Sequence, residues 1–218
     1  ILNICKKKNI ILIEDAAQSV GAYDTKGNVS GSVCDIACFS FFPGKNLGAY
    51  GDAGAVVTNN KKIYEKILQL RTHGAKRKFK HNLIGINSRM DTIQASILNK
   101  KLKRIDKINN LKRKIAKNYF KKINNVKIKL LKINLNSSFH QFVVLTPERL
   151  KFTSYLKKNN IPFGFHYPYA IHKLKAFKNL CIDKKLKNAE ITAKMCVSLP
   201  IDPYLNKRQI EFIVRKIN

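Results

Sequence analysis

A glycine-rich stretch that follows an aromatic segment constrains the fold of this chain more than any other feature. Residues 39–54 read Phe-Ser-Phe-Phe-Pro-Gly-Lys-Asn-Leu-Gly-Ala-Tyr-Gly-Asp-Ala-Gly, which places one lysine, Lys45, among a proline and four glycines. Glycine allows tight turns and a close approach of the backbone, so this stretch predicts a loop that holds a small ligand. A lysine amine in such a loop can act as a Schiff-base nucleophile, and Lys45 is therefore a candidate catalytic residue.

The basic charge of the chain indicates a solvated surface rather than a nucleic-acid site. The 218 residues include 43 lysines and arginines against 13 aspartates and glutamates, a net charge of +30. The basic residues are scattered among isoleucine and asparagine over helical faces, and no recognised nucleic-acid-binding module accompanies them. Nucleic-acid binding is the alternative that charge alone would favour. No apolar run approaches the roughly 18 residues of a membrane span, so we expect neither a nucleic-acid nor a membrane partner.

The cysteines predict a reducing compartment. Their number is odd and none forms a C-x-x-C pair, so neither a disulfide framework nor a zinc site is expected, and no metal is predicted. Reduced, buried thiols in a cytoplasmic protein fit this pattern. The residues are Cys5, Cys34, Cys38, Cys181 and Cys196.

The start of the chain predicts a fragment of a longer protein. The first residue is Ile1 instead of methionine, and no charged-then-apolar signal segment follows it. The length suffices for one substantial core or for a domain and a half.

The first part of the chain has the pattern of an α/β domain. Residues 10–13 form a short apolar run typical of a fully buried strand in a parallel sheet, and the run ends at Glu14 and Asp15. Ligands of open α/β sheets gather at the carboxyl ends of such strands, so Asp15 is a candidate site residue, although it could instead cap the following turn. Further strands are expected over residues 33–42 and 55–58, with a helix that begins at Asn59 or Asn60.

A long helix is expected to link this domain to a second one. Residues 71–87 form a basic loop without periodicity, of a length that is usually functional. One apolar stripe then runs from about 88 to 123, which predicts a single helix that bridges two domains or contacts a second subunit. Strand and helix patterns alternate again up to the last helix, so the expected domains cover residues 1–106 and 107–218.

Asp15, Ser40 and Lys45 together indicate a site for pyridoxal 5′-phosphate. The aldehyde of this cofactor needs an amine, its pyridine nitrogen needs a carboxylate, and its phosphate needs hydroxyl and amide donors. The chain offers a carboxylate at a strand end, a serine at the end of a later strand and a lysine in the loop that follows.

Five motifs in the same order resemble the nucleotide-sugar aminotransferases of the DegT/DnrJ/StrS group. The resemblance implies a fold-type I aminotransferase, of which this chain would hold the C-terminal part of the large α/β domain and a small C-terminal α/β domain. It also implies a further stretch before the first motif. The motifs are residues 13–19, 39–48, 85–91 with Gln94 and Ala95, 166–168 with His172, and 189–190 with 198–200.

The resemblance assigns cofactor roles to five residues. Lys45 matches the lysine that binds the cofactor covalently and moves the proton between donor carbon and cofactor. Asp15 matches the carboxylate at the pyridine nitrogen, Gln18 the side chain at the ring oxygen, and Ser40 a phosphate-binding hydroxyl. Asn87 matches an asparagine that reaches the cofactor phosphate of the partner subunit, which implies a homodimer with shared sites; alternatively, Asn87 caps the long helix.

Three further residues match positions near the sugar. Without the resemblance, His166 and Tyr167 would be read as packing residues, and Arg89 as a surface residue. The motifs are closest to enzymes that aminate C3 of a dTDP-linked 3-keto-6-deoxyhexose, with L-glutamate as the expected amino donor. Enzymes for UDP-linked 3-keto uronates share much of the pattern, and there Arg89 could meet the sugar carboxylate.

Two other functions are alternatives to this one. Relatives that dehydrate their substrate have histidine at the position of Lys45, so the lysine argues against that chemistry. A non-enzymatic regulator or a decayed pseudoenzyme is the alternative of another class, suggested by the absent first part and the basic bias.

Overall fold

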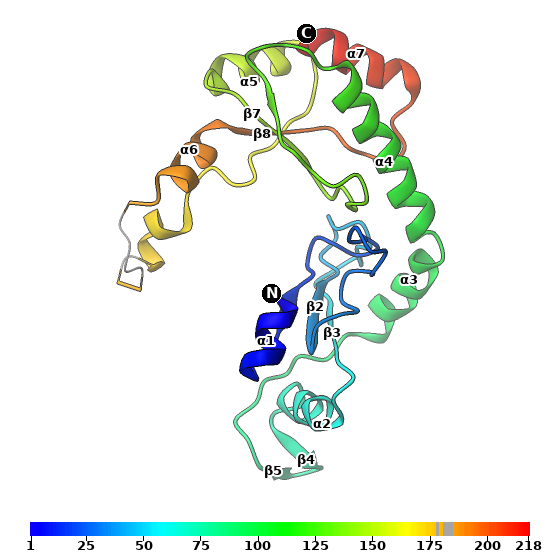
Figure 1. Cartoon of the computed structure of the whole chain (residues 1–218). Coiled ribbons are helices and arrows are strands. Elements are labelled where there is room, and N and C mark those ends of the chain that lie inside the picture. Colours follow the sequence, from blue (N-terminus) through cyan, green and yellow to red (C-terminus); the bar gives the residue numbers. More distant parts are fainter. Residues whose placement is uncertain (178, 181–184) are drawn as a thin grey trace. The chain divides into compact units, whose positions relative to one another are not determined.

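The computed structural model describes residues 1–177, 179–180 and 185–218 (Figure 1). These residues form two compact units: unit 1 is Ile1–Asn109 with Asn136–His140, and unit 2 is Asn110–Leu135 with Gln141–Asn218. The chain first leaves unit 1 after Asn109, near the expected boundary at 106, whereas the return of residues 136–140 to unit 1 has no sequence signal.

Unit 1 is built on a three-stranded sheet in the order β1-β2-β3. Strand β1 is parallel to β2, as expected, and β3 is antiparallel to β2. The expectation that the apolar run is fully buried is wrong, because Ile11 and Ile13 are each 61% exposed. The physical reason is that β1 is an edge strand that pairs only with β2 among the described residues. The strands are β1 Ile13–Asp15, β2 Ile36–Ser40 and β3 Gly54–Val57, preceded by helix α1 Leu2–Lys8.

The remaining elements of unit 1 follow the sheet. Helix α2 (Lys61–Leu70) begins at Asn60, whose side-chain oxygen accepts bonds from the Lys62 and Ile63 amides, so the expected cap is confirmed. The segment expected as an unstructured loop contains a hairpin of β4 (Ala75–Arg77) and β5 (Lys80–His81).

The single helix expected over residues 88–123 is wrong, because two helices cover this range. Helix α3 is Thr92–Leu102 and helix α4 is Ile105–Lys122. The sequence from Lys101 to Arg104 contains neither glycine nor proline, so nothing local marks the break. Tertiary contacts favour it instead: the Lys101 amine donates to the Gly48 carbonyl, and Ile105 joins a small core with Leu47.

Unit 2 packs helices on an antiparallel sheet in the order β6-β7-β8. The rings of Tyr119 and Phe120, on α4, contact Phe142 of β7 at centroid distances of 5.0 and 5.1 Å. The C-terminus returns to the end of α4, where the Asn218 amide donates to the Lys122 carbonyl (Figure 1). The further elements are β6 Lys129–Leu130, β7 Phe142–Leu145, α5 Arg149–Lys158, the 3₁₀ turns Ile171–Lys173 and Lys175–Phe177, α6 Lys187–Met195, β8 Cys196–Leu199 and α7 Lys207–Ile217.

The cysteines of the described residues are all unpaired, but only one is buried. Cys196 is buried, whereas Cys5, Cys34 and Cys38 are partly exposed, so the expectation of buried thiols is wrong for these three. Cys34 lies beside the turn at Gly31, and Cys38 lies on the sheet face that carries Asp15, where little chain covers it. Cys181 lies outside the described residues. Within the described ranges, none of the helices is long and apolar enough to cross a membrane.

Candidate active site

Two strand ends of unit 1 bring a carboxylate and a hydroxyl to the same edge of the sheet. Asp15 ends β1 and is in register with Cys38 of β2, and Ser40 ends β2 two residues further on. Side chains alternate between the faces of a sheet, so Asp15, Cys38 and Ser40 share one face. Both strands run in the same direction, which places Asp15 and Ser40 at the carboxyl edge where α/β proteins bind ligands.

The Asp15 carboxylate keeps most of its acceptor capacity. One oxygen accepts the Ala17 amide at 3.0 Å, so the capping alternative describes a real contact. Within the part of the chain that the structure describes, no other donor contacts this exposed carboxylate. The cap therefore leaves the second oxygen available to a ligand.

The opposite face of the same strand carries a second carboxylate in a hydrogen-bond network. Glu14 accepts from the Ser30 hydroxyl at 2.6 Å and from the Gly31 amide at 2.9 Å. The Cys34 thiol also donates to Glu14 at 3.5 Å. Burial is the main cause that raises the pKa of Cys34, and this hydrogen bond is the second. Because both Glu14 oxygens are engaged, this residue holds the turn at Gly31 against β1, while Asp15 faces the other side.

Lys45 lies in a tight loop that leaves the end of β2 and returns to it. The Lys45 amide donates to the Phe42 carbonyl at 2.9 Å, and the Ala49 amide donates to the Phe41 carbonyl at 2.8 Å. A side chain at Gly48 would meet the Pro43 carbonyl at 2.3 Å, so glycine is required for the loop to close. Lys45 is half-buried, and among the described residues no hydrogen bond or ion pair engages its amine.

Helix α3 supports the loop from one side. Leu47 and Ala49 pack with Leu98 in the small core of unit 1. The Gln94 side-chain oxygen accepts the Tyr50 amide at 2.8 Å. The Lys101 amine bonds the Gly48 carbonyl and lies 4.7 Å from the centre of the Tyr50 ring. The backbone of the loop is thus fixed at several points while the Lys45 amine stays free.

The other cofactor candidates of unit 1 occupy different settings. The Ser40 hydroxyl accepts the Phe42 amide at 3.3 Å, which leaves its own hydrogen available. Gln18 has an exposed side chain three residues after Asp15, and its carbonyl accepts the Ser138 hydroxyl at 2.8 Å. Asp15, Gln18, Ser40 and Lys45 therefore all lie in segments that adjoin the carboxyl edge of the β1–β2 pair.

Asn87 and Arg89 lie on an exposed segment before α3. Asn87 pairs with Thr72 through the backbone, and the cap of α3 is Asp91, so the capping alternative for Asn87 is wrong. The reason is that α3 begins later than the apolar stripe suggested. Neither the Asn87 nor the Arg89 side chain makes a hydrogen bond or an ion pair within the described residues.

His166 and Tyr167 belong to unit 2. The His166 ring nitrogen Nδ1 lies 2.7 Å from the Ser198 hydroxyl, and burial lowers the pKa of the imidazole. Tyr167 is 63% exposed, and its ring stands edge-on to His166 at 5.4 Å. His166 thus contacts Ser198 of β8, and Tyr167 presents its ring to solvent.

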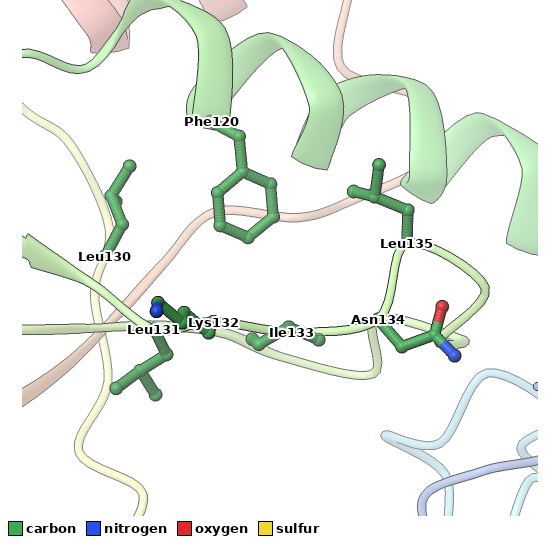
Figure 2. A pocket seen from close by; sticks show the side chains of 7 residues that line it. All are labelled: Phe120, Leu130, Leu131, Lys132, Ile133, Asn134 and Leu135. Carbon is green, nitrogen blue, oxygen red and sulfur yellow. The ribbon is translucent and has the colours of Figure 1, made fainter. Parts of the chain in front are cut away.

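A pocket in unit 2 is lined by none of the candidate residues. It has a volume of about 560 Å³. Figure 2 shows Phe120 of α4 pointing toward the segment from Leu130 to Leu135. This lining is apolar except for Lys132 and Asn134, and it offers no carboxylate or nucleophile, so it does not form a catalytic centre. Among the described residues, no group of three or more His, Cys, Asp or Glu is placed to hold a metal ion.

The sequence did not predict the residues whose hydrogen bonds fix the Lys45 loop. Asn46, Asn109 and Ser138 form a partly buried hydrogen-bond network that begins next to Lys45 in the chain. Asn46 lay within the quoted motif, but Asn109 and Ser138 are polar residues far away in sequence, and only their burial distinguishes them.

The comparison with known proteins places the chain in a family. Residues 1–218 match the sequence model described as the DegT/DnrJ/EryC1/StrS aminotransferase family. The chain belongs to this family, as its motifs indicated.

The chain is also similar to individual members. It is 40% identical over 217 residues to dTDP-3-amino-3,6-dideoxy-alpha-D-galactopyranose transaminase from Aneurinibacillus thermoaerophilus, covering 99% of this chain and 59% of that protein. It is 37% identical over 212 residues to UDP-2-acetamido-2-deoxy-3-oxo-D-glucuronate aminotransferase from Pseudomonas aeruginosa, covering 96% and 58%.

A solved structure shares the fold. The crystal structure of DesV from S. venezuelae in complex with a ketimine intermediate superposes with a TM-score of 0.92 at 32% identity. The match covers 99% of this chain and 59% of that chain. The mixed α/β fold of these aminotransferases is therefore confirmed, and the chain spans about three fifths of the length of the relatives it matches.

Proposed function

We propose that this chain is part of a pyridoxal 5′-phosphate-dependent aminotransferase that transfers an amino group, from L-glutamate, to a keto sugar nucleotide. The observation that carries the proposal is the half-buried Lys45 amine, which is free of partners among the described residues and lies in a loop at the strand edge where Asp15 and Ser40 end. Membership of an aminotransferase family supports it.

The residues present fit this cofactor by their chemistry. The edge offers one amine, one carboxylate with an unoccupied oxygen and one hydroxyl with a free hydrogen, which are the groups that the cofactor needs. Gly48 and Gly51 let the loop pack closely against Pro43 and Gln94, which a side chain at either position would crowd. When bound, the cofactor supplies an electron-accepting ring that stabilises the carbanion formed at the amino-acid carbon.

Three residues of this chain have proposed roles in that chemistry. Lys45 binds the cofactor through its amine and, once released, takes and returns the proton of the donor carbon. Asp15 faces the pyridine nitrogen and keeps it protonated by its negative charge. The Ser40 hydroxyl donates to the phosphate, and Gln18 lies at the ring oxygen.

The substrate proposed first is a dTDP-linked 3-keto-6-deoxyhexose. The similarity to a dTDP-sugar transaminase supports it, and the similarity to a UDP-uronate aminotransferase supports the alternative of a UDP-linked 3-keto uronate. In the alternative, the exposed Arg89 guanidinium pairs with the sugar carboxylate. His166 and Tyr167 are proposed near the sugar in either case. Such amino sugars are building blocks of polysaccharides, including O-antigens.

We also propose a homodimer with shared active sites in the cytoplasm. Asn87 has a free side chain and follows Ile84 and Ile86, which are 99% and 66% exposed, as expected of a surface that a second subunit covers. From this surface, Asn87 would reach the cofactor phosphate of the partner. The unpaired cysteines support a reducing compartment. The expected domains, 1–106 and 107–218, remain a proposal about the complete protein.

The experiment that tests the activity uses Lys45→Ala. The protein is purified with pyridoxal 5′-phosphate, and the long-wavelength absorbance of lysine-bound cofactor is recorded before and after treatment with borohydride. We expect a borohydride-sensitive band in the wild type and in Lys66→Ala, an exposed lysine on α2, and no such band in Lys45→Ala. A band that persists unchanged in Lys45→Ala contradicts the proposal. A wild type that shows no band and binds DNA in a salt-sensitive manner favours nucleic-acid binding.

A second experiment identifies the sugar. The protein is incubated with glutamate and each candidate keto sugar nucleotide, and the amino sugar product is detected. If the UDP uronate is the substrate, Arg89→Leu raises its KM at least tenfold, since a charge-assisted pair is lost. If the deoxyhexose is the substrate, Arg89→Leu leaves its turnover within about twofold of the wild type.

A further inference from the structure

A partly buried hydrogen-bond network starts at Asn46, the residue after Lys45, in unit 1. The Asn46 side-chain amide donates to Asn109 Oδ1 at 2.9 Å and to the Ser138 carbonyl at 2.7 Å. Asn109 Nδ2 donates to the Val20 carbonyl at 2.9 Å, and the Ser138 hydroxyl donates to the Gln18 carbonyl at 2.8 Å. The network thus joins the residue after Lys45 to the segment that follows Asp15.

Asn109 uses both ends of its amide and has no access to water. Its exposed fraction is 0%, and that of Ser138 is 1%. The Val20 carbonyl can only accept, so it must face the amino end of Asn109, and the oxygen then faces the Asn46 donor. Removing either half of such a buried pair leaves an unsatisfied polar group, which costs about 1–3 kcal/mol.

The contact with Val20 also explains a glycine. Gly21 has a positive φ of 69°, and a side chain there would approach Asn109 Nδ2 to 2.5 Å. The backbone at Val20 and Gly21 is therefore shaped so that the amide of Asn109 can reach it.

The side chain of Val20 also packs against the small core that contains Leu47 and Ala49 of the loop, and the network adds directional bonds to this apolar contact. The supports from α3, through Gln94 and Lys101, reach the loop at Gly48 and Tyr50, on its return path. The Asn46 contacts lie next to Lys45 itself and lead to Gln18 and Val20. The two sets of supports therefore act on different parts of the loop.

We infer that Asn46, Asn109 and Ser138 are positioning residues that set the Lys45 amine relative to Asp15 and thereby the affinity and protonation of the bound cofactor. This inference rests on the proposed function. The distance between an amine and a carboxylate decides how strongly each one influences the protonation of the other. A rigid link between their two segments fixes that distance.

The test uses variants that remove one or both side-chain bonds of the network. Asn109→Asp keeps the acceptor for Asn46 and loses the donor to Val20, and Ser138→Ala loses only the hydroxyl bond to Gln18. Asn109→Leu has a similar size and loses both bonds. Lys101→Met is the matched control, since it removes a bond to the same loop on its α3 side. For each protein, the affinity for pyridoxal 5′-phosphate, the pH midpoint of the lysine-bound absorbance band and the unfolding midpoint without cofactor are measured.

We expect Asn109→Leu, which removes both bonds without adding a charge, to weaken cofactor affinity at least tenfold, as the lost buried bonds predict, and to shift the pH midpoint of the band. Ser138→Ala shifts both in the same direction by less, and Lys101→Met leaves the pH midpoint unchanged. The inference is overturned if Asn109→Leu retains the wild-type pH midpoint, whatever its stability, or if Lys101→Met shifts the midpoint equally. A wild type without a borohydride-sensitive band overturns the proposed function instead.

Discussion

Unit 1 and unit 2 are stabilised by different kinds of interaction. In unit 2, large apolar side chains fill a core: Tyr119, Phe142 and Leu156 are almost completely buried. In unit 1, the small core around Leu47 is supplemented by hydrogen bonds between side chains and the backbone, and large apolar residues such as Ile84 face solvent.

This difference determines which substitutions each unit tolerates. A core of apolar side chains depends on filled volume. It therefore tolerates an apolar substitution of similar size better than the loss of an aromatic ring. A loop held by directional hydrogen bonds depends on its donors and acceptors. It therefore tolerates a change in the size of an exposed side chain better than the loss of a hydrogen-bonding side-chain amide. The loop of Lys45 is of the second kind, as a site that must hold an amine at a fixed position requires.

The largest effect is expected at the centre of unit 2. Phe142 is 1% exposed and contacts two aromatic rings of α4. Phe142→Ala removes these contacts and leaves a cavity, which should lower the free energy of unfolding by about 3–5 kcal/mol. Denaturant unfolding followed by far-UV circular dichroism measures the change.

The control is an exposed ring in unit 1. Phe79 is 83% exposed, so Phe79→Ala should change the free energy of unfolding by no more than about 0.5 kcal/mol. Equal losses in the two variants would show that the contrast between the units is wrong.

The next effect is a gain of stability, also in unit 2. Lys112 on α4 is 8% exposed, and burial lowers its pKa from 10.5 to about 8, while Asp202 opposes the shift. Burial of its ammonium form therefore costs stability at neutral pH, and Lys112→Met should raise the free energy of unfolding by about 1 kcal/mol, because the lost attraction to Asp202 offsets part of the gain. The exposed Lys117→Met on the same helix should change it little.

The sign of the pH dependence follows from the lowered pKa of Lys112. The wild type has its full stability above the unfolded pKa of 10.5 and loses it as the pH falls through about 8. The gap between Lys112→Met and the wild type should therefore be widest below pH 8 and close toward pH 10.5 in unfolding experiments. A gap that does not change with pH would exclude burial of charge as the cause.

The strands and the family motifs could be predicted from the sequence because they depend on local patterns. The parallel strand that ends at Asp15 and the cap at Asn60 were visible in this way. The break between α3 and α4 was not, because the contacts of Lys101 and Ile105 with the Lys45 loop come from residues far away in sequence. The exposure of Ile13 depends on which neighbours a strand has, which no local pattern records.

The candidate site shows the same limit. Lys45, Asp15 and Ser40 carry chemistry that a glycine-rich loop and two strand ends make recognisable. Asn109 and Ser138 carry no such signal, since buried asparagine and serine look like surface residues in a sequence rich in asparagine. Their role follows only from the partners that the fold brings to them.

A smaller effect compares two asparagine caps, one in each unit. Asn206 forms a capping box with Gln209 at the start of α7, which buries Ile213 and Val214. Asn60 caps α2, in which no residue is buried. Asn206→Ala should lower the free energy of global unfolding by about 1 kcal/mol, since α7 is part of a core. Asn60→Ala should mainly increase hydrogen exchange of the α2 amides, and equal global losses would contradict the comparison.

The smallest effect concerns the acid response of unit 2. Burial lowers the pKa of His166 below its ordinary value of 6.5, so the neutral ring is the form that the folded state favours. This contribution to stability is complete above pH 6.5 and is lost as the pH falls through the folded pKa. In His166→Asn, which keeps a polar atom for Ser198, the fall of the unfolding midpoint between about pH 7.5 and pH 5 should be smaller than in the wild type. His73→Asn, at an exposed position of unit 1 with a positive φ that asparagine tolerates, should keep the wild-type response. If His73→Asn and His166→Asn blunt the acid response equally, the response does not come from the partly buried imidazole of His166.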